Sequence, residues 1–457
     1  MSGSRPAFAR HTRAIGRQQR LSGLLALAFS LTLVCSLCAP SQALSLDEAI
    51  QKAIEASFDL KIAATDVSIS RQDVLRTQLN EYLPAATFRV NTEYARDLTG
   101  SAMPSVRSVG DTISVNNTLY QNSMALQLSY NVLDFGVRRH KVRYLKQDVQ
   151  AKAAAARAEL GALKEKVVRL YTEALLADTD RRVQQLVASS QQEVTILKQR
   201  LYQAGLISRA EVADEAVQLA QSLADAQAQT DRYEQALSRL SQVTHETYSG
   251  KGTALEPLQA RAQVDDFQSV DFTNTAQTRE VDHQIAQKRE ELKVLNRQLL
   301  PAITAYGNYR LYGSDPQRVL STYRQTEPFA ASVGMATSIA LFDAGRQVAG
   351  RKKIHLELEK LSLQREKVID EQRNRWLSTV KAEEAAQRAA QQAEVVLRER
   401  ESKLGLLNRL ADERMLDQTL LIKAKIKTLA DRRERDKAAI ERLSALETLR
   451  ILAEGAP

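Results

Sequence analysis

The amino-acid sequence predicts an α+β membrane protein built from two tandem repeats, in which long coiled-coil helices alternate with short amphipathic strands. Helix-forming residues dominate while only 5% of residues are aromatic, and one order of motifs occurs twice along the chain. The hydrophobic period also changes to two at corresponding places in both copies. With 44% apolar residues, 17 Gly, 9 Pro and 2 Cys, the 457-residue chain is not a collagen, a disulfide-rich miniprotein or a mostly disordered protein.

Residues 1–43 have the pattern of a secretory signal peptide. Five arginines without an acidic residue precede an apolar run over residues 21–39, and Ser41 and Ala43 are small residues at positions −3 and −1 of a cut after Ala43. The alternative is a retained membrane helix, because the run is long enough to span a bilayer. Cleavage would remove both cysteines and leave 414 of the 457 residues, and the loss of five arginines would lower the formal net charge from +9 to +4.

Two pairs of motifs indicate the duplication. Leu83-Pro84 and Leu300-Pro301 each end a helical segment, with an offset of 217 residues, and Leu133-Asp134-Phe135-Gly136 and Phe342-Asp343-Ala344-Gly345 each end an alternating block, with an offset of 209 residues. We therefore predict a first repeat over residues 44–248, an irregular join over residues 249–274 and a second repeat over residues 275–457.

Each repeat contains a stretch that predicts a β-hairpin, at residues 85–134 and 302–343. Four segments of about ten residues alternate apolar with polar or small residues, and ten residues is the length that a tilted strand needs to cross a bilayer. A soluble sheet would alternate too, but 8 of the 13 tyrosines fall within residues 82–136 and 300–345, which include the two hairpins and their flanks, as in an interfacial girdle, and this favours membrane strands. The polar residues that we expect to face water are Arg89, Asn91, Glu93, Gln127, Asn131, Asn308 and Arg310.

The remaining sequence of each repeat predicts helices. One helix should run from Ser45 to about Asn80, and long helical hairpins should follow the strands at residues 137–242 and 346–452. The seven-residue repeat of Ala153, Leu160, Val167 and Ala174 is typical of a left-handed coiled coil. The first hairpin should turn at residues 205–208, before a capping box, and the second at residues 405–408.

Four membrane strands leave two open edges, and unpaired backbone groups in lipid cost several kcal/mol each. Three chains would supply twelve strands, enough for an outer-membrane barrel with an open lumen, and their helical hairpins would continue it as an α-helical barrel. The sequence therefore predicts a homotrimer.

The duplicated order of helix, Leu-Pro, strand pair, Asp-x-Gly and long helical hairpin resembles the TolC family of outer-membrane efflux proteins. Both repeats carry the motifs, and residues 202–208 resemble that family's signature at the first hairpin turn. The resemblance implies a trimeric channel-tunnel in the outer membrane of a Gram-negative bacterium that extends into the periplasm. It also implies a periplasmic adaptor protein and an inner-membrane transporter, ABC-type or proton-driven, as partners in efflux or type I protein secretion.

The same resemblance implies that the hairpin turns gate the channel at its periplasmic end. Charged residues there would tie neighbouring hairpins by ion pairs worth at most about 1 kcal/mol each when exposed. The second turn departs from the family pattern, with Asn408 where Ser or Thr is expected and Arg414 where an acid is expected. The matching positions are Gly205, Ser208, Glu211, Asp214, Gly405, Asp412, Glu413, Arg414 and Asp417.

No motif predicts an enzyme. The five histidines lack metal-ligand spacing, and neither a nucleotide-binding Gly-rich loop nor a Gly-x-Ser-x-Gly motif is present, so we predict no cofactor, no metal and no nucleic-acid partner. Two alternatives stay open: a secreted periplasmic coiled-coil protein that binds polyanions, and a diffusion porin. The sequence leaves the cargo undetermined.

Overall fold

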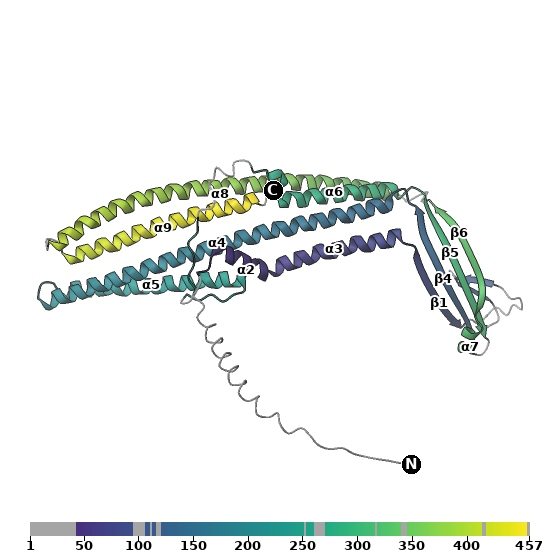
Figure 1. Ribbon diagram of the computed structural model, residues 1–457, viewed down its shortest axis with the longest axis horizontal. Helices are drawn as coiled ribbons and strands as arrows, with labels where there is room; N and C mark the ends of the chain where they lie inside the picture. Colours follow the sequence, from purple (N-terminus) through teal and green to yellow (C-terminus); the bar gives the residue numbers. More distant parts are fainter. Residues whose placement is uncertain are drawn as a thin grey trace, which may run out of the picture. The chain divides into compact units, whose positions relative to one another are not determined.

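The computed structural model describes residues 43–94, 106–109, 112–115, 120–250, 253–259, 270–315, 318–339, 345–413 and 417–454 (Figure 1). The predicted signal peptide up to residue 42 and the motif residues Phe342, Asp343 and Ala344 lie outside them. The helices are α2 (Leu46–Ala56), α3 (Phe58–Tyr82), α4 (Val137–Gln203), α5 (Arg209–Thr244), α6 (Ala276–Arg297), α7 (Val319–Arg324), α8 (Arg346–Asp412) and α9 (Gln418–Glu454), with a 3-10 turn, η2, at Phe272–Asn274. The strands are β1 (Ala85–Tyr94), β2 (Val106–Val109), β3 (Thr112–Val115), β4 (Tyr120–Leu133), β5 (Ala302–Asp315) and β6 (Glu327–Ser338).

The chain forms two compact units, and the first contains residues up to 56, 167–259 and 386–444. Its core includes Tyr171, Tyr233 and Leu240, all buried. The Tyr171 hydroxyl lies 2.7 Å from the carbonyl oxygens of both Leu44 and Glu256, and Leu44 also pairs as a parallel β-bridge with Leu255. Burial raises the pKa of Tyr171, so the hydroxyl stays protonated and keeps the start of the described chain attached to the segment after α5.

The second unit, residues 57–166, 260–385 and 445–457, contains the sheet. Its four long strands pair antiparallel in the order β1-β4-β5-β6, and β2 and β3 form a separate pair. The short helix α7 packs on β4 and β5, and a Cβ atom at Gly313 would lie 2.1 Å from the carbonyl oxygen of Thr322, so this contact requires glycine. The four strands and the long helices confirm the α+β class.

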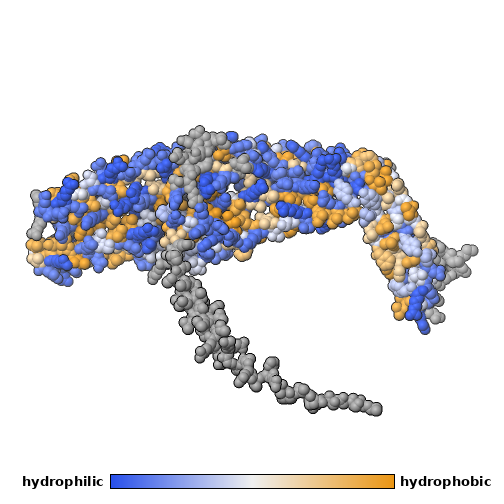
Figure 2. Space-filling view, in the orientation of Figure 1, coloured by the Kyte–Doolittle hydropathy of each residue, from blue (hydrophilic) through white to orange (hydrophobic). Residues whose placement is uncertain are grey.

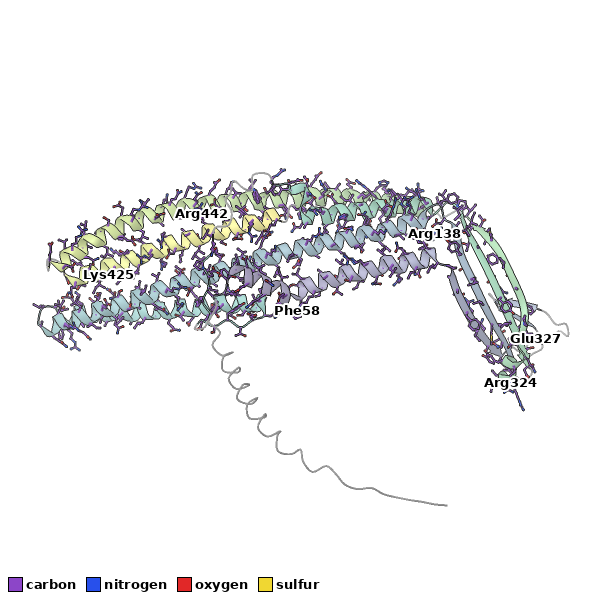
Figure 3. The ribbon with its side chains drawn as sticks, in the orientation of Figure 1. Phe58, Arg138, Arg324, Glu327, Lys425 and Arg442 are labelled. Atoms are coloured by element: carbon purple, nitrogen blue, oxygen red, sulfur yellow. The ribbon has the colours of Figure 1, made fainter. Side chains whose placement is uncertain are left out.

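A tight turn at Asp134, Phe135 and Gly136 joins β4 to α4. Phe135 and Gly136 have φ values of +52° and +89°, and the Asp134 carboxylate accepts hydrogen bonds from the backbone N–H groups of Gly136 (3.0 Å) and Arg138 (2.7 Å). The repeated Asp-x-Gly motif therefore acts here as the strand-to-helix junction. Figure 3 marks Arg138 at this junction, where its guanidinium lies over the rings of Tyr82 and Tyr130.

Two predictions about the helices were wrong. The first helix is interrupted, because Ser57 ends α2 and its hydroxyl caps α3 by accepting a hydrogen bond from the Leu60 N–H. The predicted break at residues 405–408 does not exist, since α8 continues to Asp412. A single glycine destabilises a helix by only about 1 kcal/mol, and the leucines on either side of Gly405 are strong helix formers, so the helix continues through this position. Among the described residues, no helix combines the length and apolarity needed to cross a membrane.

Candidate functional site

The strand register places all seven predicted water-facing residues on one face of the sheet. Cross-strand partners in an antiparallel sheet point to the same side. One row joins Thr87, Gln127, Asn308 and Ser332, and the next joins Arg89, Ala125, Arg310 and Ala330. Asn91, Glu93 and Asn131 follow at intervals of two residues and share this side, which we call the polar face.

The opposite face of the sheet is apolar and exposed. Phe88 is 64% exposed, Val333 93% and Met335 73%. In a soluble protein, a sheet usually buries its apolar side chains against a hydrophobic core. The same face carries Val90, Leu126, Leu128 and Tyr309. An exposed apolar face opposite a polar face is the pattern of a membrane strand with water on one side.

The turn between α4 and α5 is a Schellman motif followed by a capping box. The Leu206 N–H donates to the Leu201 carbonyl (2.9 Å) and the Gly205 N–H to the Tyr202 carbonyl (2.9 Å), while Gly205 has a φ of +75°. Ser208 then caps α5, because its hydroxyl accepts from the Glu211 N–H (3.3 Å) and the Glu211 carboxylate accepts from the Ser208 N–H (3.3 Å).

Glu211 and Asp214, the two acidic candidates at this turn, differ in their surroundings. Hydrogen bonds from the backbone and hydroxyl of Ser208 lower the pKa of the Glu211 carboxyl, and Lys198 Nζ lies 3.5 Å from it. Glu211 therefore has a structural partner within its own hairpin, whereas Asp214 is exposed. Leu206 at the turn is 71% exposed, so the turn presents an apolar side chain beside its charges.

The turn between α8 and α9 lies about nine residues after the predicted position. Asp417 caps α9, because its carboxylate accepts from the Thr419 N–H (2.9 Å), and Asp412 and Glu413 are exposed at the end of α8. Arg414 lies outside the described residues. Gly405 is inside α8, seven residues before the last residue of the helix, and is not part of the turn.

The structure also reveals charged contacts that the sequence did not predict. Glu215 on α5 is only 4% exposed and pairs with Lys423 of α9, whose Nζ lies 3.1 Å away, and Asp180 on α4 pairs with Lys437 of α9 (2.9 Å). These pairs join the two helical hairpins within the first unit. No sequence signal distinguishes them from the many other charges on these helices.

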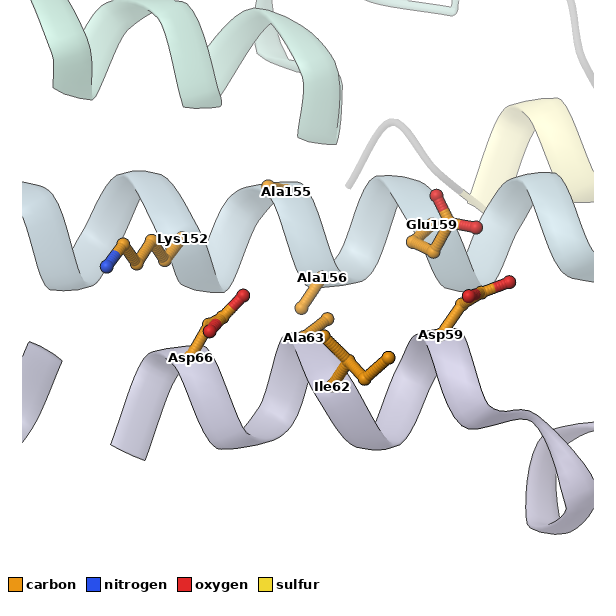
Figure 4. A pocket seen from close by; sticks show the side chains of 8 residues that line it. All are labelled: Asp59, Ile62, Ala63, Asp66, Lys152, Ala155, Ala156 and Glu159. Atoms are coloured by element: carbon orange, nitrogen blue, oxygen red, sulfur yellow. The ribbon is translucent and has the colours of Figure 1, made fainter. Parts of the chain in front are cut away.

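The grooves along the helices are open and lack the features of a ligand pocket. Figure 4 shows the one between α3 and α4, about 420 Å³ in volume, where Ala63 and Ala156 face one another and charged side chains lie at the rim. Among the residues that the structure describes, no three His, Cys, Asp or Glu side chains are placed to hold a metal ion.

Comparison with known proteins identifies the class. Residues 49–246, most of the first predicted repeat, match the family described as Outer membrane efflux protein. No curated protein sequence matches the chain. The match confirms the resemblance to the TolC-like outer-membrane efflux proteins, and the protein is located in the outer membrane and extends into the periplasm.

Solved structures show the same fold at low sequence identity. The open-state outer membrane channel MtrE of Neisseria gonorrhoeae is 16% identical with a TM-score of 0.71, and the alignment covers 90% of this chain and 89% of that one. CusC, described for transmembrane channel formation, is 16% identical with a TM-score of 0.70 and coverages of 89% and 92%. The outer membrane protein VceC of Vibrio cholerae is 14% identical with a TM-score of 0.68 and coverages of 90% and 96%.

Proposed function

We propose that three copies of this chain form an exit duct across the periplasm and outer membrane. Each copy would contribute β1, β4, β5 and β6 to a twelve-stranded barrel, with the polar face lining a water-filled lumen and the apolar face in lipid. The helical hairpins of the two proposed repeats would continue the lumen as an α-helical barrel. A periplasmic adaptor and an inner-membrane ABC-type or proton-driven transporter would supply the cargo and the energy.

One observation carries this proposal. β1 and β6 are the outer strands of the four-stranded sheet, and each pairs with a single neighbour among the described residues. The sheet also exposes an apolar face, which favours lipid, and lipid leaves no water to satisfy an open strand edge. Pairing β6 of one copy with β1 of the next satisfies both edges, and the family match makes closure by identical copies the simplest solution.

The proposal extends to the hairpin turns and to cleavage of the signal peptide. Asp214, Asp412, Glu413 and Asp417 are exposed at or near the turns, and we infer that they contact neighbouring hairpins or the adaptor. Gly405 is not part of the proposed gate, because it lies within α8. Cleavage after Ala43 would release the mature chain to the periplasm.

Cysteine cross-linking tests the trimer directly, because the described residues contain no cysteine. Thr87→Cys on β1 is combined in turn with Ala330→Cys, Ser332→Cys or Ala336→Cys on β6, all on the polar face. Oxidation in outer-membrane fractions should give covalent dimers and trimers for at least one pair. Phe88→Cys with the same partners is the matched control, because Phe88 points to the other side of the sheet.

Two results would refute the proposal. A chain that stays monomeric for every pair on the polar face would exclude closure through β1 and β6. A secreted coiled-coil protein that binds polyanions would instead be recovered in the soluble periplasmic fraction, without conductance in planar bilayers.

A further inference from the structure

The two helices that follow the membrane strands begin with positive charge. Neither α4 nor α8 has an acidic residue in its first turn. A helix N-terminus carries a partial positive charge that disfavours cations within the first turn, so Arg138 and Arg139 on α4 and Arg346 on α8 oppose the helix dipole. The basic residues that precede the first acid are Arg138, Arg139, Lys141, Arg143 and Lys146 on α4, and Arg346, Arg351, Lys352 and Lys353 on α8.

Internal contacts account for only some of these residues. Arg138 pairs with Asp134 at the junction, and Lys141 Nζ lies 2.7 Å from a carboxylate oxygen of Glu81. Arg139, Arg143 and Lys146 are exposed, and no carboxylate of the described part of the chain pairs with them. Their spacing of four and three residues places all three on one side of α4, which we call the basic face.

The basic face lies beside the end of the apolar sheet face. Leu128, Tyr130 and Val132 are exposed on the last part of β4, only a few residues before Arg139. α6 brings the starts of both helices together, since Arg297 donates to the Phe135 carbonyl (3.1 Å) and the Leu295 carbonyl accepts from Gln347 (2.6 Å). Figure 2 shows largely hydrophobic and pale colours over the strands and mostly hydrophilic colours over the helices that follow.

We propose that the basic face binds the phosphate groups of anionic phospholipids in the leaflet around the helical end of the barrel. This inference rests on the proposed function, because it requires the apolar sheet face to lie in lipid. Just beyond that face, exposed Lys and Arg side chains reach the depth of the lipid headgroups. Each positive charge near an anionic membrane surface raises the affinity for that surface by about fivefold. Lipid phosphates at the basic face thus hold the barrel at a fixed depth and offset the unfavourable position of Arg139 in the first turn of α4.

Lipid preference in reconstituted protein tests the inference. The test variant is Arg139→Gln, Arg143→Gln and Lys146→Gln combined, in the full chain. The matched control is Arg157→Gln, Lys166→Gln and Arg169→Gln, three other exposed cations on α4 that begin 18 residues further along the same helix, about 27 Å away at the α-helical rise. Each protein is reconstituted in phosphatidylcholine vesicles that contain either spin-labelled phosphatidylglycerol or spin-labelled phosphatidylcholine, and the motionally restricted fraction of each label is measured.

We expect the unmodified protein and the control to restrict phosphatidylglycerol more than phosphatidylcholine. This preference should fall at least twofold in the test variant, because each surface charge raises the affinity for an anionic surface by about fivefold. High salt should reduce the preference of the unmodified protein to that of the variant. An unchanged preference in the test variant would overturn the inference, because the basic face would then point to the lumen or to a neighbouring copy. Conductance measured on the same vesicles separates the two proposals: conducting channels without lipid preference refute only this one, whereas absent conductance refutes the duct.

Discussion

Replacement of Arg138 by alanine should destabilise the strand-to-helix junction at the start of α4. Its Nε donates to Asp134 Oδ2 (3.1 Å), and its Nη1 donates to the carbonyls of Asn131 (2.8 Å) and Glu81 (3.3 Å). Charge-assisted hydrogen bonds contribute roughly 1.5–3 kcal/mol each, so the two shorter ones total about 3–6 kcal/mol. The Arg138 and Asp134 side chains are 12% and 10% exposed, so water replaces little of this, and we expect a loss of about 3 kcal/mol.

The assay is denaturant unfolding of the protein in lipid vesicles, followed by the heat- and urea-sensitive change in electrophoretic mobility. Arg139→Ala is the control, measured like Arg138→Ala in vesicles of phosphatidylcholine alone, where the proposed binding of anionic lipid does not contribute. Arg139 is exposed and has no ion pair within the described ranges, so its replacement should change stability by less than about 0.5 kcal/mol. The two variants remove the same side chain at adjacent positions. Equal midpoints would contradict the reasoning, because the network around Asp134 would then contribute nothing beyond an exposed arginine.

Three further predictions concern the turns and the sheet. Gly205→Ala should weaken the α4–α5 turn by about 1 kcal/mol, because Gly205 has a φ of +75°, whereas Gly405→Ala should stabilise α8 by up to about 1 kcal/mol. Neither added methyl group meets an atom within 4 Å, so only the backbone conformation differs between the two sites. Equal changes in amide exchange at the two sites would contradict the helical position of Gly405. Gly313→Ala should make α7 susceptible to proteolytic cleavage, because its Cβ would lie 2.1 Å from the Thr322 carbonyl oxygen. Gly307→Ala is the control, and it should leave α7 protected because the nearest atom to its Cβ lies at 4.0 Å. Equal cleavage of the two variants would show that α7 tolerates the clash. The pKa of the Glu211 carboxyl is lowered, so its contribution to capping is present above the ordinary glutamate pKa and is lost as the pH falls through the lowered value. Amide protection at Ser208 should therefore decrease at a pH below the ordinary glutamate pKa in the unmodified protein but not in Glu211→Gln, and a parallel decrease in both would exclude this carboxylate as the cause.

The position of the second hairpin turn follows from the offset between the two repeats and not from the glycine at position 405. The Asp-x-Gly motifs are 209 residues apart, and so are the starts of α4 and α8, the capping residues Ser208 and Asp417, and the starts of α5 and α9. The same offset places Arg414 opposite Gly205. The interpretation followed the glycine at position 405 instead, because glycine is the strongest local signal of a helix end. Asp417 replaces Ser208 as the cap, so the function of the position is kept while its residue type is not.

The shared side of the seven polar residues could be predicted from the sequence, because a period of two fixes which side chains of a strand lie together, whereas their exposure to water in a lumen stays a prediction. The contacts between the helical hairpins could not be predicted. Helical periodicity identifies the side of a helix that is buried but not the residue on the other helix that meets it, and it gave no sign that Glu215 is buried and paired with Lys423 of α9. Loss of Lys423, whose side chain is 45% exposed, would leave the buried Glu215 carboxylate without its ion-pair partner, so this pair favours keeping the two hairpins of one chain together. Exposed charges such as Asp214 remain available for the proposed contacts between copies. Opening at the turns would therefore require movement of whole hairpin pairs and not separation of α5 from α9.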